Sequence, residues 1–336
     1  MSSLRPVDPL VPFVVEAGVL ILDGGLATEL EKAGFDLTNH LWSARLLKDA
    51  PEAILAVHRA YLEAGADCIT AASYQASLPG FERVGLDERA AQALLRRSVE
   101  LALQARDAFW SDPKNRVGRL RPLVAASVGP YGAFLANGAE YTGDYDLDEG
   151  GLVRFHRGRL RILEEAGADL LACETLPSAA EARALVSLLE ERENTGAWLS
   201  FSCRDGERIS DGTPFVEVVR EIRGSRAVLA VGVNCTAPQH VEGLLRAAAG
   251  VTTKPLVAYP NSGEQYDART KTWLGPSSGG DWAERGKAWH RAGARLIGGC
   301  CRTGPQHVNG LREALLGSGT RQGLELRPDG VGSGEP

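Results

Sequence analysis

Short apolar runs alternate along the chain with longer segments in which apolar residues recur at helical spacing. The runs are rich in Val, Ile, Leu and Ala, which is typical of buried strands. The longer segments carry apolar residues three or four positions apart, as in helices that cover a sheet with one face. The apolar runs predict strands at 19–22, 68–71, 123–128, 169–173, 198–202, 228–233, 256–259 and 295–298. The longer segments predict helices at 51–64, 88–110, 153–165, 179–191, 214–222, 239–248 and 280–291.

This alternation predicts parallel strands joined by crossover helices. The same joint between helix and strand recurs as Ala-Gly-Ala at 64–66, 166–168 and 292–294, where a left-handed glycine can end the helix. Eight strands favour an α/β fold of the TIM type, a single-domain (β/α)8 barrel over 13–316. A doubly wound open sheet is the alternative, because the repeated joint suits both architectures.

Composition and charge narrow the class of protein. The 336 residues are 44% hydrophobic and 24% charged, the balance of a globular enzyme. With 37 basic and 43 acidic residues the net charge is −6, so we expect no nucleic-acid or membrane surface. No run is long enough to span a membrane and no signal peptide is evident, which favours a cytoplasmic protein, either a monomer or a small homo-oligomer. Residues 1–12 are expected to be a flexible N-terminus, and 317–336 a disordered C-terminal tail.

Three cysteines at predicted strand ends are the main candidates for chemistry. Cys300 and Cys301 are adjacent after the eighth predicted strand, and Cys235 follows the sixth. Neighbouring cysteines do not readily bond to each other, because the disulfide would strain the peptide between them. In a barrel the sixth and eighth strands are separated by only one strand, so the three thiols can meet. Three thiolates can hold zinc and leave one position open, as in catalytic zinc sites. Three buried structural cysteines are the alternative.

Other polar residues gather at the carboxyl ends of predicted strands, where barrels build their active sites. Asp23 follows the first strand, and Glu174 ends the otherwise apolar fourth strand. A partly desolvated carboxylate there favours a cation such as the ammonium of an amino acid. The alternatives are a salt bridge with a loop arginine for Glu174 and helix capping for Asp23. The long polar segment 132–151 is a candidate lid.

Six motifs, taken together, resemble the zinc-dependent homocysteine S-methyltransferases, in particular those that use S-methylmethionine or S-adenosylmethionine. The resemblance runs from about residue 19 to residue 315. The motifs are Leu22-Asp23-Gly24-Gly25, Thr70-Ala71-Ala72-Ser73-Tyr74-Gln75-Ala76, Ser127-Val128-Gly129-Pro130-Tyr131-Gly132-Ala133, Ala172-Cys173-Glu174-Thr175-Leu176-Pro177, Gly232-Val233-Asn234-Cys235 and Gly298-Gly299-Cys300-Cys301-Arg302-Thr303.

The resemblance implies an enzyme of methionine biosynthesis. It would transfer a methyl group from a sulfonium donor, S-methylmethionine or possibly S-adenosylmethionine, to the zinc-bound thiolate of L-homocysteine, giving methionine. One zinc ion per chain would be held by Cys235, Cys300 and Cys301. Asp23 and Glu174 would surround the amino group of homocysteine, and Asn234 would lie beside the metal. The remaining substrate-binding candidates are Thr28, Ser73 and Tyr74.

Two alternatives concern the substrates. The acceptor could be another thiol or a selenol such as selenocysteine, and the donor could be betaine. Betaine-using relatives carry a tyrosine where this chain has Thr175, which argues against betaine. Trp42, Tyr74 and Tyr131 are candidates for contact with the cationic sulfur, with ordinary packing as the alternative. Gly25 stands where the family often has methionine.

Overall fold

The strands of the protein close into a barrel. The computed structural model describes residues 8–37, 42–192, 195–267, 272–275 and 281–317. Eight parallel strands pair in the order β1-β10-β7-β6-β5-β4-β3-β2, and a parallel bridge between Leu22 and Cys68 joins the two edge strands. This bridge excludes the open sheet. The strands are β1 (Leu20–Ile21), β2 (Cys68–Thr70), β3 (Leu123–Val128), β4 (Leu170–Leu176), β5 (Ala197–Phe201), β6 (Val228–Asn234), β7 (Leu256–Tyr259) and β10 (Ala294–Ile297).

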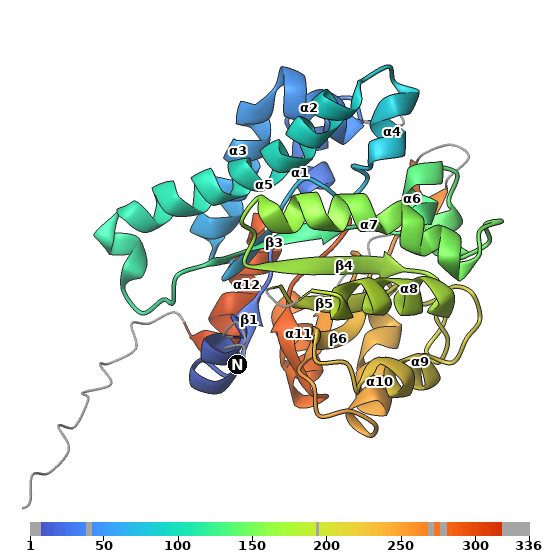
Figure 1. Cartoon of the computed structure of the whole chain (residues 1–336). Helices are drawn as coiled ribbons and strands as arrows, with labels where there is room; N and C mark the ends of the chain where they lie inside the picture. The colour runs from blue at the N-terminus through green and yellow to red at the C-terminus, as the bar shows by residue number, and fades with distance from the viewer. Residues whose placement is uncertain (1–7, 38–41, 193–194, 268–271, 276–280, 318–336) are drawn as a thin grey trace, which may run out of the picture.

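Helices surround these strands (Figure 1). The predicted helices are present as α3 (Pro51–Ala64), α5 (Glu88–Ser111), α7 (Glu149–Glu165), α8 (Ala179–Glu190), α9 (Phe215–Ile222), α10 (Pro238–Ala249) and α11 (Trp282–Arg291). The side chains of Asp87, Asp148 and Ser178 accept the amide hydrogen bonds that begin α5, α7 and α8. The glycine of each predicted joint has a positive φ, which confirms how these helices end.

Short elements escaped prediction, because fewer than about two helical turns give little periodicity. The helices among them are α1 (Leu26–Lys32), α2 (Trp42–Asp49), α4 (Leu78–Arg83) and α6 (Tyr131–Leu135). The remaining elements are the longer α12 (Pro305–Leu316), the helical turns η1 (Pro12–Glu16), η2 (Pro113–Arg116) and η3 (Ala139–Tyr141), and the antiparallel hairpin of β8 (Gln265–Asp267) and β9 (Thr272–Leu274).

Two cores hold the barrel together. Along β3, Leu123 and Ala125 belong to a core that includes Trp198, whereas Val124, Ala126 and Val128 belong to a larger core shared with the helices. Successive side chains of a strand point to opposite faces, so the first core fills the barrel and the second lies between barrel and helices. All of β3 except Ser127 is therefore apolar, which is why it reads as a nearly continuous apolar run.

Part of the amino-terminal segment that was predicted to be flexible is packed against the barrel. Leu10 is 1% exposed and Phe13 is 3% exposed, and both belong to the core inside the barrel. Residues 8–12 therefore pack onto the barrel, because burying these side chains stabilises the segment. They are not part of a flexible start over 1–12. Residues 1–7, and residues 318–336 of the tail predicted at 317–336, lie outside the described residues.

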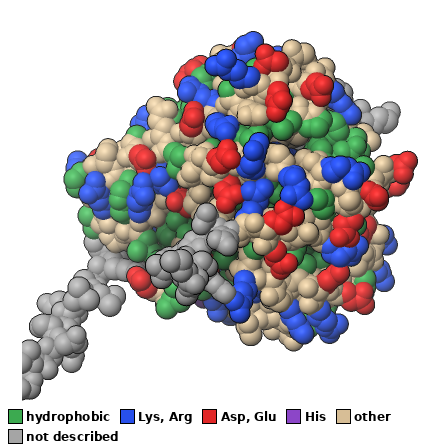
Figure 2. Space-filling view, viewed as in Figure 1, with side chains coloured by type: hydrophobic (Ala, Val, Ile, Leu, Met, Phe, Trp, Pro, Cys, Tyr) green, Lys and Arg blue, Asp and Glu red, His purple; other side chains and the backbone are tan. Residues whose placement is uncertain are grey.

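The surface offers no patch of a single charge on the face drawn in Figure 2, where Lys and Arg side chains lie among Asp and Glu. This agrees with the small net charge of −6. Within the described residues, no helix combines the length and apolar character that crossing a membrane requires.

Candidate active site

A cavity of about 250 Å³ opens at the carboxyl ends of the barrel strands. It is lined by Asp23 after β1, Thr70 and Tyr74 at β2, Ser127 and Glu174 in β3 and β4, and cysteines after β6 and β10. Strand β5 gives no lining residue: Arg204 and Asp205, which follow it, face solvent and lie 3.7 Å apart as an ion pair. The other strand ends converge as barrel geometry requires.

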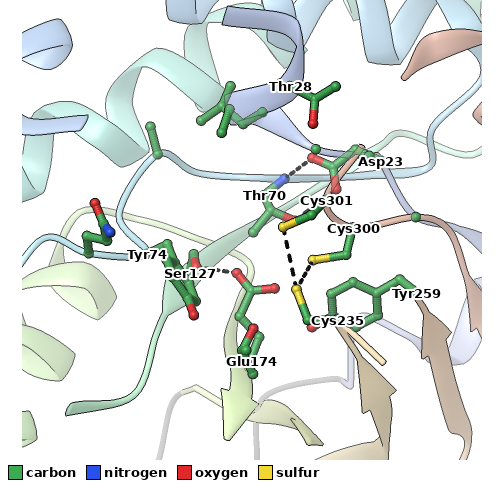
Figure 3. A pocket seen from close by; sticks show the side chains of 18 of the residues that line it. Asp23, Thr28, Thr70, Tyr74, Ser127, Glu174, Cys235, Tyr259, Cys300 and Cys301 are labelled. Carbon is green, nitrogen blue, oxygen red and sulfur yellow. Dashed lines mark hydrogen bonds between the residues drawn. The ribbon is translucent and has the colours of Figure 1, made fainter. Parts of the chain in front are cut away.

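Three thiols meet at one wall of this cavity (Figure 3). The Sγ of Cys235 lies 2.7 Å from that of Cys300 and 3.7 Å from that of Cys301. All three sulfurs fall within 4.8 Å of one another, an arrangement that can hold a metal ion. Hydrogen bonds from the other two thiols hold the pKa of Cys235 well below its usual range, so one negative charge is already favoured there. The structure thus brings together the three cysteines that the sequence predicted.

The loop that carries Cys300 and Cys301 is fastened to the segment after β1. The hydroxyl of Thr28 accepts a hydrogen bond from the Arg302 amide at 2.9 Å, so this predicted substrate-binding residue also positions the loop. The Tyr61 hydroxyl lies 3.0 Å from the carbonyl oxygen of Gly25 and 3.1 Å from that of Thr303. A Cβ on Gly25 would lie 2.8 Å from the Cys300 carbonyl oxygen. The close approach of the two loops therefore explains the glycine.

Asn234 supports a strained turn beside the cysteines. Thr175 has φ +58° and Cys235 has φ +45°, values that non-glycine residues rarely adopt. The Asn234 side chain accepts from the Thr175 amide and donates to its hydroxyl, both at 2.7 Å, and its Nδ2 lies 3.9 Å from the Cys300 sulfur. Asn234 therefore lies beside the thiols, as predicted, and it holds Thr175 in place.

Asp23 is buried at the opposite side of the thiols from Glu174 (Figure 3). Its two oxygens accept hydrogen bonds from the amide and hydroxyl of Thr70, at 2.7 and 3.0 Å. Burial raises the pKa of Asp23 to about 8, although the bonds from Thr70 oppose the shift. Asp23 therefore does not cap the next helix, and its carboxylate would be stabilised by a cation that entered the cavity.

Glu174 lies inside β4 rather than after it, where the pairing with β5 is irregular. Its Oε1 accepts a hydrogen bond from the Ser127 hydroxyl, and Tyr259 also bonds to its carboxyl group. Burial raises its pKa to about 7 against the effect of these bonds. Its partners are thus neutral hydroxyls and not a loop arginine, which leaves the negative charge available to a bound cation.

Some of the predicted aromatic and serine residues line the cavity, and others do not. Tyr74 lines the cavity, whereas Tyr131 packs against Phe134, Tyr145 and Phe155 away from it. Ser73 was predicted to bind substrate, but it is fully buried and does not line the cavity. Its hydroxyl donates a hydrogen bond to the Ser127 carbonyl oxygen at 2.7 Å. Ser73 therefore joins the ends of β2 and β3. The side chain of Trp42 lies outside the described part of the protein.

Several lining residues were missed, among them Glu140 and Tyr141, which lie far along the chain from any strand end. Both lie in η3, within the polar segment predicted as a lid. A carboxylate that far from any strand gave no signal of its own, because only the folded loop brings it over the cavity. The acidic residues that line the cavity are Asp23, Glu31, Glu140 and Glu174, and no Lys, Arg or His is among the described residues around it. The cavity can therefore stabilise positively charged ligands.

Comparison with known proteins supports this picture. The family model described as homocysteine S-methyltransferase matches residues 20–315. The homocysteine S-methyltransferase YbgG of Bacillus subtilis is 50% identical over 290 residues, which cover 86% of this chain and 92% of that protein. The selenocysteine Se-methyltransferase of Brassica oleracea var. italica is 44% identical, over 89% of each chain.

A solved structure matches across almost its whole length. It is the metallated form of the homocysteine methyltransferase MmuM from Escherichia coli, with a TM-score of 0.81 and 45% identity. The match covers 90% of this chain and 99% of that one. The similarity therefore includes the barrel and every strand end that contributes to the cavity.

Proposed function

This chain belongs to the homocysteine S-methyltransferase family and is an enzyme of that class, and from this premise we propose its metal, its methyl donor and the roles of its residues. The metal is one zinc ion per chain, the donor is a sulfonium compound, and the product is methionine. The observation that carries the proposal is the convergence of three thiols on a cavity with acidic walls.

The chemistry of the three side chains fits zinc. Thiolates are ligands that zinc prefers, and a set of three without a fourth protein ligand is typical of catalytic zinc. Cys235, Cys300 and Cys301 would hold the ion, and the described residues offer no further His, Cys, Asp or Glu in the cluster. When bound, zinc supplies an open position for the homocysteine thiol and lowers the pKa of that thiol.

Asp23 and Glu174 are proposed to bind the ammonium group of homocysteine. Both carboxyl groups are buried beside the thiols, and burial raises both pKa values. A bound ammonium would favour the ionised carboxylates and so recover part of the free energy lost to desolvation. Ser127 and Tyr259 orient Glu174 through hydrogen bonds and thereby position the substrate.

Methyl transfer then needs alignment more than proton transfer. The homocysteine sulfur forms a bond to the methyl carbon while the bond from that carbon to the donor sulfur breaks. The bonding electrons stay on the donor sulfur, so a sulfonium cation leaves as a neutral thioether and no acid is required. The protein contributes by holding both substrates in line. We propose S-methylmethionine as the preferred donor, with S-adenosylmethionine as a second one.

A selenol acceptor is the second candidate function. The similarity to a selenocysteine Se-methyltransferase, at 44% identity, favours testing it. Betaine remains the less favoured donor, since Thr175, which lines the cavity and is bonded to Asn234, stands where betaine-using relatives carry a tyrosine.

The proposal is tested with zinc analysis and a turnover assay. Purified under reducing conditions, the protein should contain about one zinc per chain and should methylate homocysteine with S-methylmethionine faster than with S-adenosylmethionine or betaine. Cys300→Ala should lose both zinc and turnover. Cys203→Ala is the matched control, because Cys203 is buried but does not line the cavity. A Cys300→Ala protein that kept zinc and turnover would refute the proposal. Faster methylation of selenocysteine than of homocysteine would favour the second candidate.

A further inference from the structure

Two buried acceptor oxygens, on residues that line the cavity, have no hydrogen-bond partner. Among the described residues, the buried unpartnered side-chain atoms that belong to the cavity wall are Oε2 of Glu140 and Oε1 of Gln75. Leaving such atoms unpaired costs free energy, so each marks a side chain of the cavity wall that gains a hydrogen bond when it turns toward a ligand donor. Two acceptors, one of them a carboxylate, suit an ammonium group, which has three N–H donors and a positive charge.

Glu140 is held rigidly where it can serve this purpose. It is 8% exposed, and its carbonyl oxygen accepts a hydrogen bond at 3.0 Å from Ser202, next to the end of β5. A Cβ on Gly132 would lie 2.4 Å from the Glu140 amide nitrogen, so η3 packs directly on α6. The backbone on both sides of the carboxylate is thus fixed by the scaffold, as a binding residue requires.

The cavity must hold two amino acids at once, and each has an ammonium group. Asp23 and Glu174 lie beside the thiols from the barrel strands and are assigned to homocysteine, whose sulfur belongs at the cysteines. Both oxygens of Asp23 already accept hydrogen bonds from Thr70, and Ser127 and Tyr259 bond to Glu174. Glu140 comes from the segment over the cavity and has an unused oxygen. Among the described residues that line the cavity, it is the remaining buried carboxylate for the second substrate.

We propose that Glu140, assisted by Gln75, binds the ammonium group of the amino-acid methyl donor and so makes the enzyme select donors that carry this group. The inference rests on the proposed function and extends it, because it names the part of the donor that is recognised. A sulfonium compound without an ammonium group would leave both oxygens unpaired, and it would be a poor donor for that reason.

The test compares two donors in two proteins. One donor is S-methylmethionine, and the other is its desamino analogue, 4-(dimethylsulfonio)butanoate, which keeps the sulfonium and the carboxylate. The wild type should have a KM at least about tenfold lower for S-methylmethionine, the effect of one charged hydrogen bond. Glu140→Gln should raise the KM for S-methylmethionine by about tenfold to a hundredfold. It should leave the KM of the desamino donor and that of homocysteine unchanged within about threefold.

Controls separate this role from a structural one. Asp144→Asn removes an exposed carboxylate from the same segment and should leave all KM values unchanged. Gln75→Leu removes the second acceptor and should raise the KM for S-methylmethionine only, which keeps the inference testable if Glu140→Gln folds poorly. Equal losses for both donors, a raised KM for homocysteine instead, or unchanged kinetics would each overturn the assignment while the methyltransferase function stood. Absence of turnover in the wild type would overturn both.

Discussion

The buried carboxyl group of Asp23 lowers the free energy of unfolding at neutral pH, and a bound substrate ammonium should offset this loss. The substitution Asp23→Asn measures the loss. The folded protein raises the pKa of this carboxyl group to about 8 from an ordinary value of 3.8, chiefly by burial. Between these two pH values the unfolded chain has released a proton that the folded protein still holds. The folded state then binds more protons than the unfolded state, so its stability falls as the pH rises through this window.

The size of the effect follows from the proton balance. Within the window each pH unit removes about 1.4 kcal/mol, so wild-type stability should fall by about 2–3 kcal/mol between pH 5 and pH 7 through this one group. Asparagine has nearly the same shape, can still accept from the Thr70 amide, and does not titrate. Asp23→Asn should therefore lose this part of the slope, and its advantage over the wild type should grow as the pH rises.

The assay is urea unfolding of the metal-free protein at pH 5, 6 and 7, with Asp144→Asn as an exposed control. The homocysteine affinity of the zinc-loaded Asp23→Asn protein is measured in parallel and should fall, because the charge proposed to bind the ammonium is gone. Parallel stability curves for Asp23→Asn and the wild type over this pH range would refute the reasoning. If the stability of Asp144→Asn departed from that of the wild type with pH as Asp23→Asn is expected to do, the pH dependence would come from general surface charge and not from Asp23.

Four further predictions concern single residues. Glu174→Gln should weaken homocysteine binding by about 1.5–3 kcal/mol, the range for a charged hydrogen bond, and an unchanged calorimetric titration would remove Glu174 from the site. Tyr259→Phe should destabilise the protein by about 1–3 kcal/mol in urea, since the buried Trp198 N–H loses its acceptor at 2.9 Å; an unshifted midpoint would contradict this. Asn234→Ala removes both bonds to Thr175 and should lower kcat together with stability, whereas wild-type kcat would show that the turn needs no support. Leu10→Ala should lower stability by about 2–5 kcal/mol because Leu10 fills the barrel end, and no effect would restore a flexible start.

The alternation of apolar runs and amphipathic segments along the chain supplied most of the fold prediction. The eight apolar runs coincide with the barrel strands, and β3 and β7 have the predicted bounds, because a strand buried on both faces is apolar over most of its length. The short helices α1, α4 and α6 could not be predicted in the same way. They are held by neighbouring loops, and their sequences are too short to show a period.

The candidate site was predictable wherever a reactive side chain directly followed a strand. Cys235, Cys300, Cys301 and Asp23 were found by this rule, because the carboxyl ends of barrel strands must converge. Ser73 and Tyr131 satisfied the same rule and yet turned away from the cavity. Side-chain direction after the last paired residue depends on local backbone angles and on packing partners, which adjacency to a strand does not specify.

The chain by itself indicated parallel strands joined by helices, the positions of those strands and three cysteines at strand ends, because periodicity and strand ends are local properties. Closure through Leu22 and Cys68, the burial of Leu10, the strained Thr175 held by Asn234 and the place of Glu140 in the cavity wall were decided only by the tertiary structure. Each of these depends on a contact between segments far apart along the chain, and the energy of such a contact exists only once the segments have met.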